Sequence, residues 1–383
     1  MKRSILVVVV LSLLMTVVPV AAQGVEKNIP AKSALLMDIA TGTVLYEQNA
    51  HTPLAPASVT KVMTMLLIME AIDSGKIGWD DMVTASEEAA AKGGSQIYLK
   101  VGETMSVSDM VKSIAVSSAN DCACAMAEHL AGSETAFVTM MNTRAKELGM
   151  NDTNFVNCTG LDDSEEAKNH KTSAYDIAIM SRELMKNHPD IKKFTTIWMD
   201  TVRNGTFGLS NTNKMVRFYA GATGLKTGFT SGAGYCLSAT AERDGMELVA
   251  VVMGCETSKE RFAACKSLLD YGFANYSLVQ TDLPKALTVP VVLGKAETVK
   301  VKLAQSNDLL IDKAQKNSVT TQVKLEASVN APVSKGQRLG TLTVKSGEQV
   351  LTQIPLVAET GVMKLSWGDV FSRLFRRFVM AKA

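Results

Sequence analysis

Hydrophobic and polar residues alternate with different periods along the chain, and the first half is predicted to be a hairpin followed by helices. Residues 33–47 hold two apolar runs around a Thr-Gly turn, which predicts a β-hairpin. The segment from Pro56 to Ile72 then keeps its apolar residues on helical spacing for three turns. The same helical spacing recurs over 106–117, 121–131, 134–149 and 174–187.

The pattern changes to strands at residue 223. Three apolar runs, at 223–230, 234–242 and 246–255, are separated by short turns, and the Asp-Gly of the second turn is a strong hairpin signal. A last helix is expected over about 258–272. This order of strands and helices predicts an α/β domain of the α+β kind, with an antiparallel sheet, over residues 23–280.

Beyond residue 280 the period becomes two. The runs "ETVKVKLA", "VTTQVKLEA" and "QRLGTLTVK" alternate apolar with polar residues, and glycine and proline separate them. We therefore expect a small all-β domain over 284–358.

The segment 361–383 has the pattern of an amphipathic helix. One stripe at helical spacing contains Trp367, Val370, Phe371, Leu374, Phe375 and Phe378. The rest of the segment carries Lys364, Arg373, Arg376, Arg377 and Lys382 against the single acid Asp369. An aromatic stripe with a basic opposite face favours binding to an anionic membrane surface. The alternative is a helix that docks on the protein's own core.

The N-terminus is predicted to be a signal for export. Lys2 and Arg3 precede a long apolar run that ends at Val20-Ala21-Ala22, which is the pattern of a secretory signal peptide over residues 1–22. Because the apolar run is slightly long, an uncleaved membrane anchor is the alternative. Both interpretations place the rest of the chain outside the cytoplasm.

Charge and cysteine content narrow the class of protein. Without residues 1–22 the 40 basic side chains become 38, which equals the 38 acidic ones, and this balance argues against a nucleic-acid-binding protein. The six cysteines include no C-x-x-C, and the four histidines do not cluster near them, so we expect no zinc site and no cofactor. An exported chain permits disulfides, but buried free thiols are an equal alternative.

The stretch "PASVTKVMT" contains the first candidate for chemistry. Ser58 and Lys61 are three residues apart and would share one face of a helix. A serine hydroxyl becomes a good nucleophile when a base removes its proton, and a lysine can act as that base if burial lowers its pKa. The flanking residues carry no charge, which favours a desolvated Lys61.

Two further triplets fit such a site. Ser118-Ala119-Asn120 lies between two predicted helices, where a hydroxyl could relay a proton and Asn120 could hold a substrate amide. Lys226-Thr227-Gly228 lies on a predicted strand. There the lysine offers fixed charge, the threonine a hydroxyl for a carboxylate, and the glycine room for a substrate backbone. Each triplet alone is common.

Together, S-x-x-K, S-x-N and K-T-G in this order are specific. They follow one another at intervals of 60 and 108 residues, and this set is typical of penicillin-binding proteins and class A β-lactamases. The longer blocks "SSANDCACAMAEHLAG" and "GLKTGFTSGAGYCLSATAERDG" resemble the D-alanyl-D-alanine carboxypeptidases among the low-molecular-mass penicillin-binding proteins, the S11 serine peptidases. The resemblance extends over nearly all of residues 30–383. It implies a penicillin-binding/β-lactamase-like domain, a small all-β domain and a C-terminal amphipathic helix.

The resemblance also implies roles for single residues. Ser58 would be acylated, Lys61 would be its base, and Ser118 would transfer a proton. The substrate-binding residues would be Asn120, Lys226, Thr227, Gly228, Phe229 and Arg261. Phe229 would act through its backbone N–H in an oxyanion hole, together with that of Ser58, and Arg261 would assist the substrate carboxylate. Since Arg261 lies on the last predicted helix, a solvated surface charge is the alternative. His170 matches a family block and is interpreted as structural.

The implied enzyme removes the terminal D-alanine from peptidoglycan pentapeptide stems, is inhibited by β-lactams, and lies at the outer face of the bacterial cytoplasmic membrane. One alternative is a β-lactamase, for which Glu147 to Asn151 mimics an E-x-x-x-N motif. Another is a catalytically silent peptidoglycan-binding protein, against which the intact Ser58, Lys61 and Lys226 argue.

Overall fold

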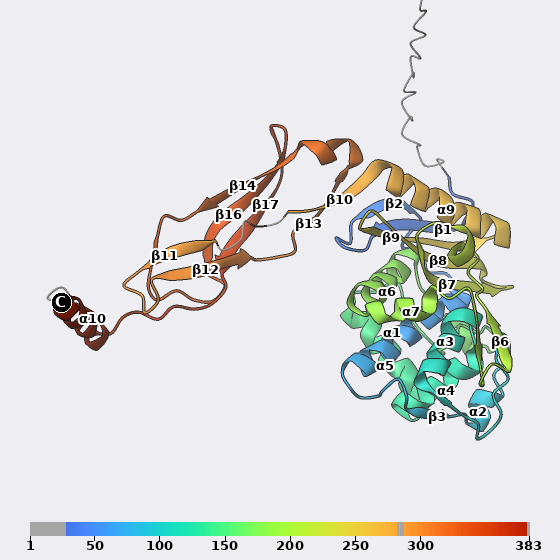
Figure 1. Ribbon diagram of the computed structural model, residues 1–383. Helices are drawn as coiled ribbons and strands as arrows, with labels where there is room; N and C mark the ends of the chain where they lie inside the picture. The colour runs from blue at the N-terminus through green and yellow to red at the C-terminus, as the bar shows by residue number, and fades with distance from the viewer. Residues whose placement is uncertain (1–27, 282, 284–286, 381–383) are drawn as a thin grey trace, which may run out of the picture.

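The computed structural model describes residues 28–281, 283 and 287–380, so the predicted signal peptide lies outside the described residues. Within α10, the side chains of Arg373 and of residues 376–380 are also outside the description. Figure 1 shows a first domain of helices around a sheet, an elongated β domain, and α10 at the end of the β domain away from the first domain.

The first domain is built on a five-stranded antiparallel sheet with the order β2-β1-β9-β8-β7. Its strands are β1 (Ser33–Asp38), β2 (Val44–Gln48), β7 (Ala222–Thr230), β8 (Gly234–Arg243) and β9 (Met246–Cys255). Side chains of β9 alternate between two cores, with Val251 on one face and Val252 on the other. Burial on both faces explains why this strand is apolar without interruption from Leu248 to Met253.

Helix α9 (Ser258–Asn275) covers one face of this sheet. Thr257 and Glu260 form a capping box at its start, a motif that stabilises helix ends by about 1 kcal/mol. Near its end Gly272 lies against the sheet, because a Cβ there would come within 2.4 Å of Leu248 Cδ1. This close approach fixes α9, and with it Arg261, over the ends of β7 and β8.

The other face is covered by most of the remaining helices of the first domain. They are α1 (Lys61–Asp73), α2 (Glu87–Ala90), α3 (Val107–Ser117), α4 (Asn120–Ala131), α5 (Glu134–Glu147), α6 (Ala174–Asn187) and α7 (Lys192–Thr195). The short helix α8 (Met215–Phe218) lies on the α9 side, because its Met215 packs in the same core as α9. The first nine residues of α1 are all buried, so this helix runs through the core. The α+β class and the five long helices are confirmed. The strands of two small antiparallel pairs are too short to produce a period in the sequence. These pairs are β3 (Met82–Thr84) with β4 (Thr104–Ser106) and β5 (Met199–Val202) with β6 (Phe207–Ser210).

The β domain contains a six-stranded sheet with the order β14-β16-β17-β12-β11-β15. The strands are β11 (Thr288–Val292), β12 (Thr298–Leu303), β14 (Val319–Leu325), β15 (Val329–Asn330), β16 (Arg338–Ser346) and β17 (Gln349–Ala358). The expected all-β domain is confirmed, but the chain enters it before the expected start. Strand β10 (Tyr276–Gln280) continues from α9 and pairs with β13 (Asp308–Asp312), so a two-stranded ribbon joins the two domains.

Helix α10 (Trp367–Met380) begins directly after the β domain. Ser366 caps it, because the hydroxyl of Ser366 accepts from the backbone N–H of Asp369 and donates to the carboxylate of Asp369. Trp367, Phe371 and Phe375 are exposed, which contradicts a helix docked on the protein's own core. No helix of the described part of the chain is long and apolar enough to span a bilayer.

The six cysteines all fall within the described residues, and each is a buried free thiol. Burial raises the pKa of the Cys236 thiol to about 11, so this side chain stays a protonated, unreactive thiol at neutral pH.

Candidate active site

Ser58 and Lys61 lie at the start of α1, on a short 3-10 turn (Ala57–Thr60) and its continuation. Lys61 Nζ is 2.9 Å from Ser58 Oγ and donates a second hydrogen bond of 2.8 Å to the carbonyl of Thr159. The Lys61 side chain is fully buried, and this burial lowers its pKa to about 7. An amine that is partly neutral at physiological pH, in contact with a hydroxyl, can take the proton of that hydroxyl.

A tight loop holds the backbone around the serine. Ala57 has a φ of +48°, a conformation that is uncommon and costly for a residue with a side chain. Its carbonyl faces Gly160 so closely that a Cβ on Gly160 would lie 1.8 Å from that oxygen. Asn157 Oδ1 accepts the backbone N–H of Gly160 at 2.7 Å, which keeps the loop in place. Strain and close contact therefore coincide next to the predicted nucleophile.

Ser118 and Asn120 lie at the junction of α3 and α4. Ser118 caps the C-terminal end of α3 in the left-handed region with a φ of +63°, and it is buried. Asn120 Nδ2 donates to the carbonyl of Gly93 at 2.7 Å, while its buried Oδ1 has no partner among the described residues. A buried acceptor without a partner is costly, so this oxygen is suited to an amide N–H of a bound ligand.

Lys226, Thr227 and Gly228 lie on the edge strand β7, against the turn that carries Ser58. Lys226 is buried, and burial together with the charges of Lys61 and Arg261 lowers its pKa well below the ordinary value. Thr227 Oγ1 donates to Thr212 Oγ1 at 2.7 Å. A Cβ on Gly228 would come within 2.6 Å of the Pro56 carbonyl oxygen, so glycine is required here for packing as well as for any room it leaves to a substrate.

Phe229 and Arg261 are held by ring stacking and backbone contacts. Phe229 is 54% exposed, and its ring stacks on Tyr235 with the centroids 4.2 Å apart. Arg261 Nη1 donates to the carbonyls of Gly228 at 3.0 Å and Cys236 at 3.3 Å, and Arg261 is 6% exposed. The alternative of a solvated surface charge is therefore wrong, because this guanidinium is buried against the end of β7.

His170 occupies a buried position behind the nucleophile turn. Its Nδ1 accepts the backbone N–H of Val156 at 3.1 Å, which assigns the proton to Nε2, and Nε2 is 2.8 Å from Thr60 Oγ1. Thr60 Oγ1 in turn donates to the carbonyl of Ala57 at 2.8 Å. Burial lowers the pKa of His170 to about 4, so the imidazole is neutral and its role in this chain of contacts is structural.

Four further residues complete the site, although the sequence motifs did not identify them as parts of it. They are Asn157, Thr159, Gly160 and Thr212. Asn157 and Gly160 are visible in the sequence as loop residues, but only the fold shows that their loop reaches Lys61. The position of Glu147 argues against the β-lactamase alternative. Glu147 is exposed at the end of α5 and pairs with Arg144 at 3.3 Å.

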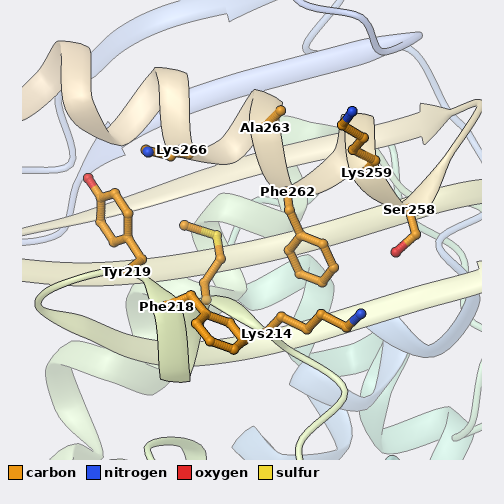
Figure 2. A pocket seen from close by; sticks show the side chains of 9 residues that line it. Lys214, Phe218, Tyr219, Ser258, Lys259, Phe262, Ala263 and Lys266 are labelled. Carbon is orange, nitrogen blue, oxygen red and sulfur yellow. The ribbon is translucent and has the colours of Figure 1, made fainter.

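A separate groove of about 530 Å³ lies beside the site, between α8 and the first turns of α9 (Figure 2). Phe218, Phe262 and Lys214 are among the residues that line it, and none of the predicted site residues does. Ser258 connects the groove to the site, because its hydroxyl accepts from Arg261 Nη2 at 3.3 Å.

Comparison with known proteins defines the class first. A family model described as D-alanyl-D-alanine carboxypeptidase matches residues 19–257, and one described as the C-terminal domain of penicillin-binding protein 5 matches residues 273–364. The chain therefore belongs to the D-alanyl-D-alanine carboxypeptidase family of peptidases, as the motifs predicted.

Individual relatives agree with this assignment. The chain is 44% identical to the D-alanyl-D-alanine carboxypeptidase DacF of Bacillus subtilis over 341 residues, which cover 87% of this chain and 86% of the relative. The crystal structure of penicillin binding protein 5 from Haemophilus influenzae aligns with a TM-score of 0.77 at 31% identity, covering 89% of this chain and 100% of that one. Penicillin-Binding Protein D2 from Listeria monocytogenes, solved in an ampicillin bound form, aligns with a TM-score of 0.57 at 32% identity, covering 65% and 99%.

Proposed function

We propose that this D-Ala-D-Ala carboxypeptidase trims peptidoglycan stem peptides through an acyl-enzyme on Ser58. The observation that carries the proposal is the 2.9 Å contact between Lys61 Nζ and Ser58 Oγ in a buried site where the lysine pKa is about 7. The neutral amine takes the hydroxyl proton as Oγ attacks the carbonyl of the penultimate D-alanine.

The leaving D-alanine needs a proton on its nitrogen. In this proposal Ser118 passes on the proton that Lys61 has taken, from the ammonium group through its hydroxyl to the leaving nitrogen. Water then attacks the acyl-enzyme carbonyl, Lys61 again acts as the base, and Ser58 is restored. The backbone N–H groups of Ser58 and Phe229 stabilise the oxyanion in both steps.

Binding of the stem peptide uses the polar groups around β7. Asn120 Oδ1, which has no partner among the described residues, accepts an amide N–H of the peptide. Thr227 and Lys226 bind the terminal carboxylate. Arg261 donates to the carbonyl of Gly228 and so supports this binding site from behind the strand.

Penicillins are expected to acylate Ser58, because their ring carbonyl and carboxylate match the same groups. The ampicillin-bound form of the Listeria relative supports this expectation. We place the enzyme outside the cytoplasmic membrane, exported by residues 1–22 and attached by α10, whose Trp367, Phe371 and Phe375 are exposed.

The test combines a labelled penicillin with a pentapeptide that ends in D-Ala-D-Ala. We expect a covalent adduct that maps to Ser58 by mass spectrometry and release of D-alanine from the peptide, and both are lost in Ser58→Ala. An adduct without D-alanine release would refute the carboxypeptidase step, and rapid turnover of the drug would favour the β-lactamase alternative.

A further inference from the structure

The exposed apolar side chains of the β domain and α10 gather at one end. Among the described residues from 287 onward, the exposed large hydrophobic residues are Val292, Leu293, Val350, Met363, Trp367, Phe371, Leu374 and Phe375. All of them except Val350 lie on α10 or beside its start. Single exposed apolar residues are ordinary on a protein surface, whereas a contiguous group indicates a binding surface.

Two segments next to α10 form what we call the tip, residues 292–295 and 362–365. The backbone N–H of Lys295 donates to the Met363 carbonyl, and that of Leu365 donates to the Leu293 carbonyl, both at 2.8 Å. Lys295 Nζ lies 3.4 Å from the carboxylate of Asp369 in the first turn of α10. The tip is thus fixed to the start of α10, beyond β11 and β12 (Figure 1).

Leu293 is the least expected residue of the tip. Its φ is +60°, a left-handed conformation that is strained for a leucine, and its side chain is 56% exposed. Asparagine or glycine would adopt this backbone with less strain and would avoid an exposed apolar group. Neither the turn nor the core of the domain accounts for a leucine at this position.

We propose that the tip is itself a membrane-binding surface, which inserts Leu293 and Met363 into the interface of an anionic bilayer beside α10. This inference rests on the proposed membrane attachment through α10. The exposed apolar side chains of the tip lie next to the start of the helix that carries the aromatic stripe, and Lys364 adds a positive charge that suits anionic head groups. Attachment through both the tip and α10 would also fix the orientation of the β domain relative to the membrane. A single helix lying in the membrane plane does not fix that orientation.

The first test measures binding of the full chain to vesicles of phosphatidylglycerol and phosphatidylcholine. The double variant L293N/M363Q removes the two apolar groups, and asparagine tolerates the positive φ of residue 293. We expect vesicle affinity to fall on the order of tenfold while the urea unfolding midpoint is unchanged or higher. V292T and V350T form a matched pair, since these two valines are 44% and 48% exposed, and only V292T is expected to weaken binding.

The second test reads insertion directly. Because the six native thiols are buried, an environment-sensitive dye will label an introduced L293C selectively, and V350C provides the control. We expect a blue shift on vesicle addition for L293C alone. If the wild-type chain does not bind vesicles, the proposed attachment itself fails. A different pattern overturns only the tip proposal. In that pattern the wild type binds vesicles and F371D/F375D does not, but L293N/M363Q binds like the wild type and the dye at residue 293 stays in water.

Discussion

Gly160 offers the sharpest test of how the nucleophile turn is held. In Gly160→Ala the new Cβ would lie 1.8 Å from the Ala57 carbonyl oxygen, 2.3 Å from the Ala57 carbonyl carbon and 2.7 Å from Thr60 Oγ1. The residue also has a φ of +81°, which adds backbone strain of about 1–2 kcal/mol. Because backbone atoms cannot move aside cheaply, the turn must shift, at a further cost of roughly 1–3 kcal/mol.

We therefore expect Gly160→Ala to lower the free energy of unfolding by about 2–5 kcal/mol. If Ser58 moves by about 1 Å, acylation by labelled penicillin should slow on the order of a hundredfold. Urea denaturation and the acylation rate measure the two effects.

Gly205→Ala is the matched control, since Gly205 has a φ of +86° and no described atom beyond its chain neighbours lies within 4 Å of the new Cβ. It should show the strain cost alone, with normal acylation. The reasoning is refuted if Gly160→Ala loses no more stability than the control and acylates at the wild-type rate.

The remaining predictions concern protonation and binding. Since Lys61 has a pKa of about 7 and acts only when neutral, the acylation rate should rise with pH through about 7, and a flat profile from pH 5 to 9 would contradict its role as base. His170 has a folded pKa of about 4, below its unfolded value of about 6.5. Folding stability should therefore be complete above pH 6.5 and fall by roughly 3 kcal/mol as the pH drops toward 4, a slope that His170→Gln should remove. Thr227→Val should raise KM for the pentapeptide more than it lowers kcat, and an unchanged KM would argue against carboxylate binding there. Glu147→Gln should leave deacylation of penicillin unchanged, whereas slower deacylation would revive the β-lactamase alternative.

Sequence patterns predicted most of the first domain because its elements are long and one-sided or wholly apolar. The run of apolar residues in β9 and the apolar stripes of α3 and α6 directly indicate which side chains are buried. Period-two alternation likewise predicted the β domain, but β10 carried no signal that it would leave the first domain to pair with β13. Pairing between distant segments depends on tertiary contacts, which local periodicity does not encode.

The same limit applies to the site. The motifs identify Ser58, Lys61 and Lys226 because their chemistry requires those side chains. Thr159 contributes only a carbonyl to Lys61, and any residue type has one. The structural requirement on Gly228 is likewise visible only once β7 lies against the nucleophile turn.

The ribbon of β10 and β13 has a consequence for limited proteolysis. Five residue pairs join these strands, and Lys313 donates to the carbonyl of Phe273 at 2.8 Å on the first-domain side. A protease that cuts the chain once between residues 281 and 287 would therefore leave the two fragments held by backbone hydrogen bonds. Such a nicked enzyme would run as two bands on a denaturing gel and elute as one species from a sizing column.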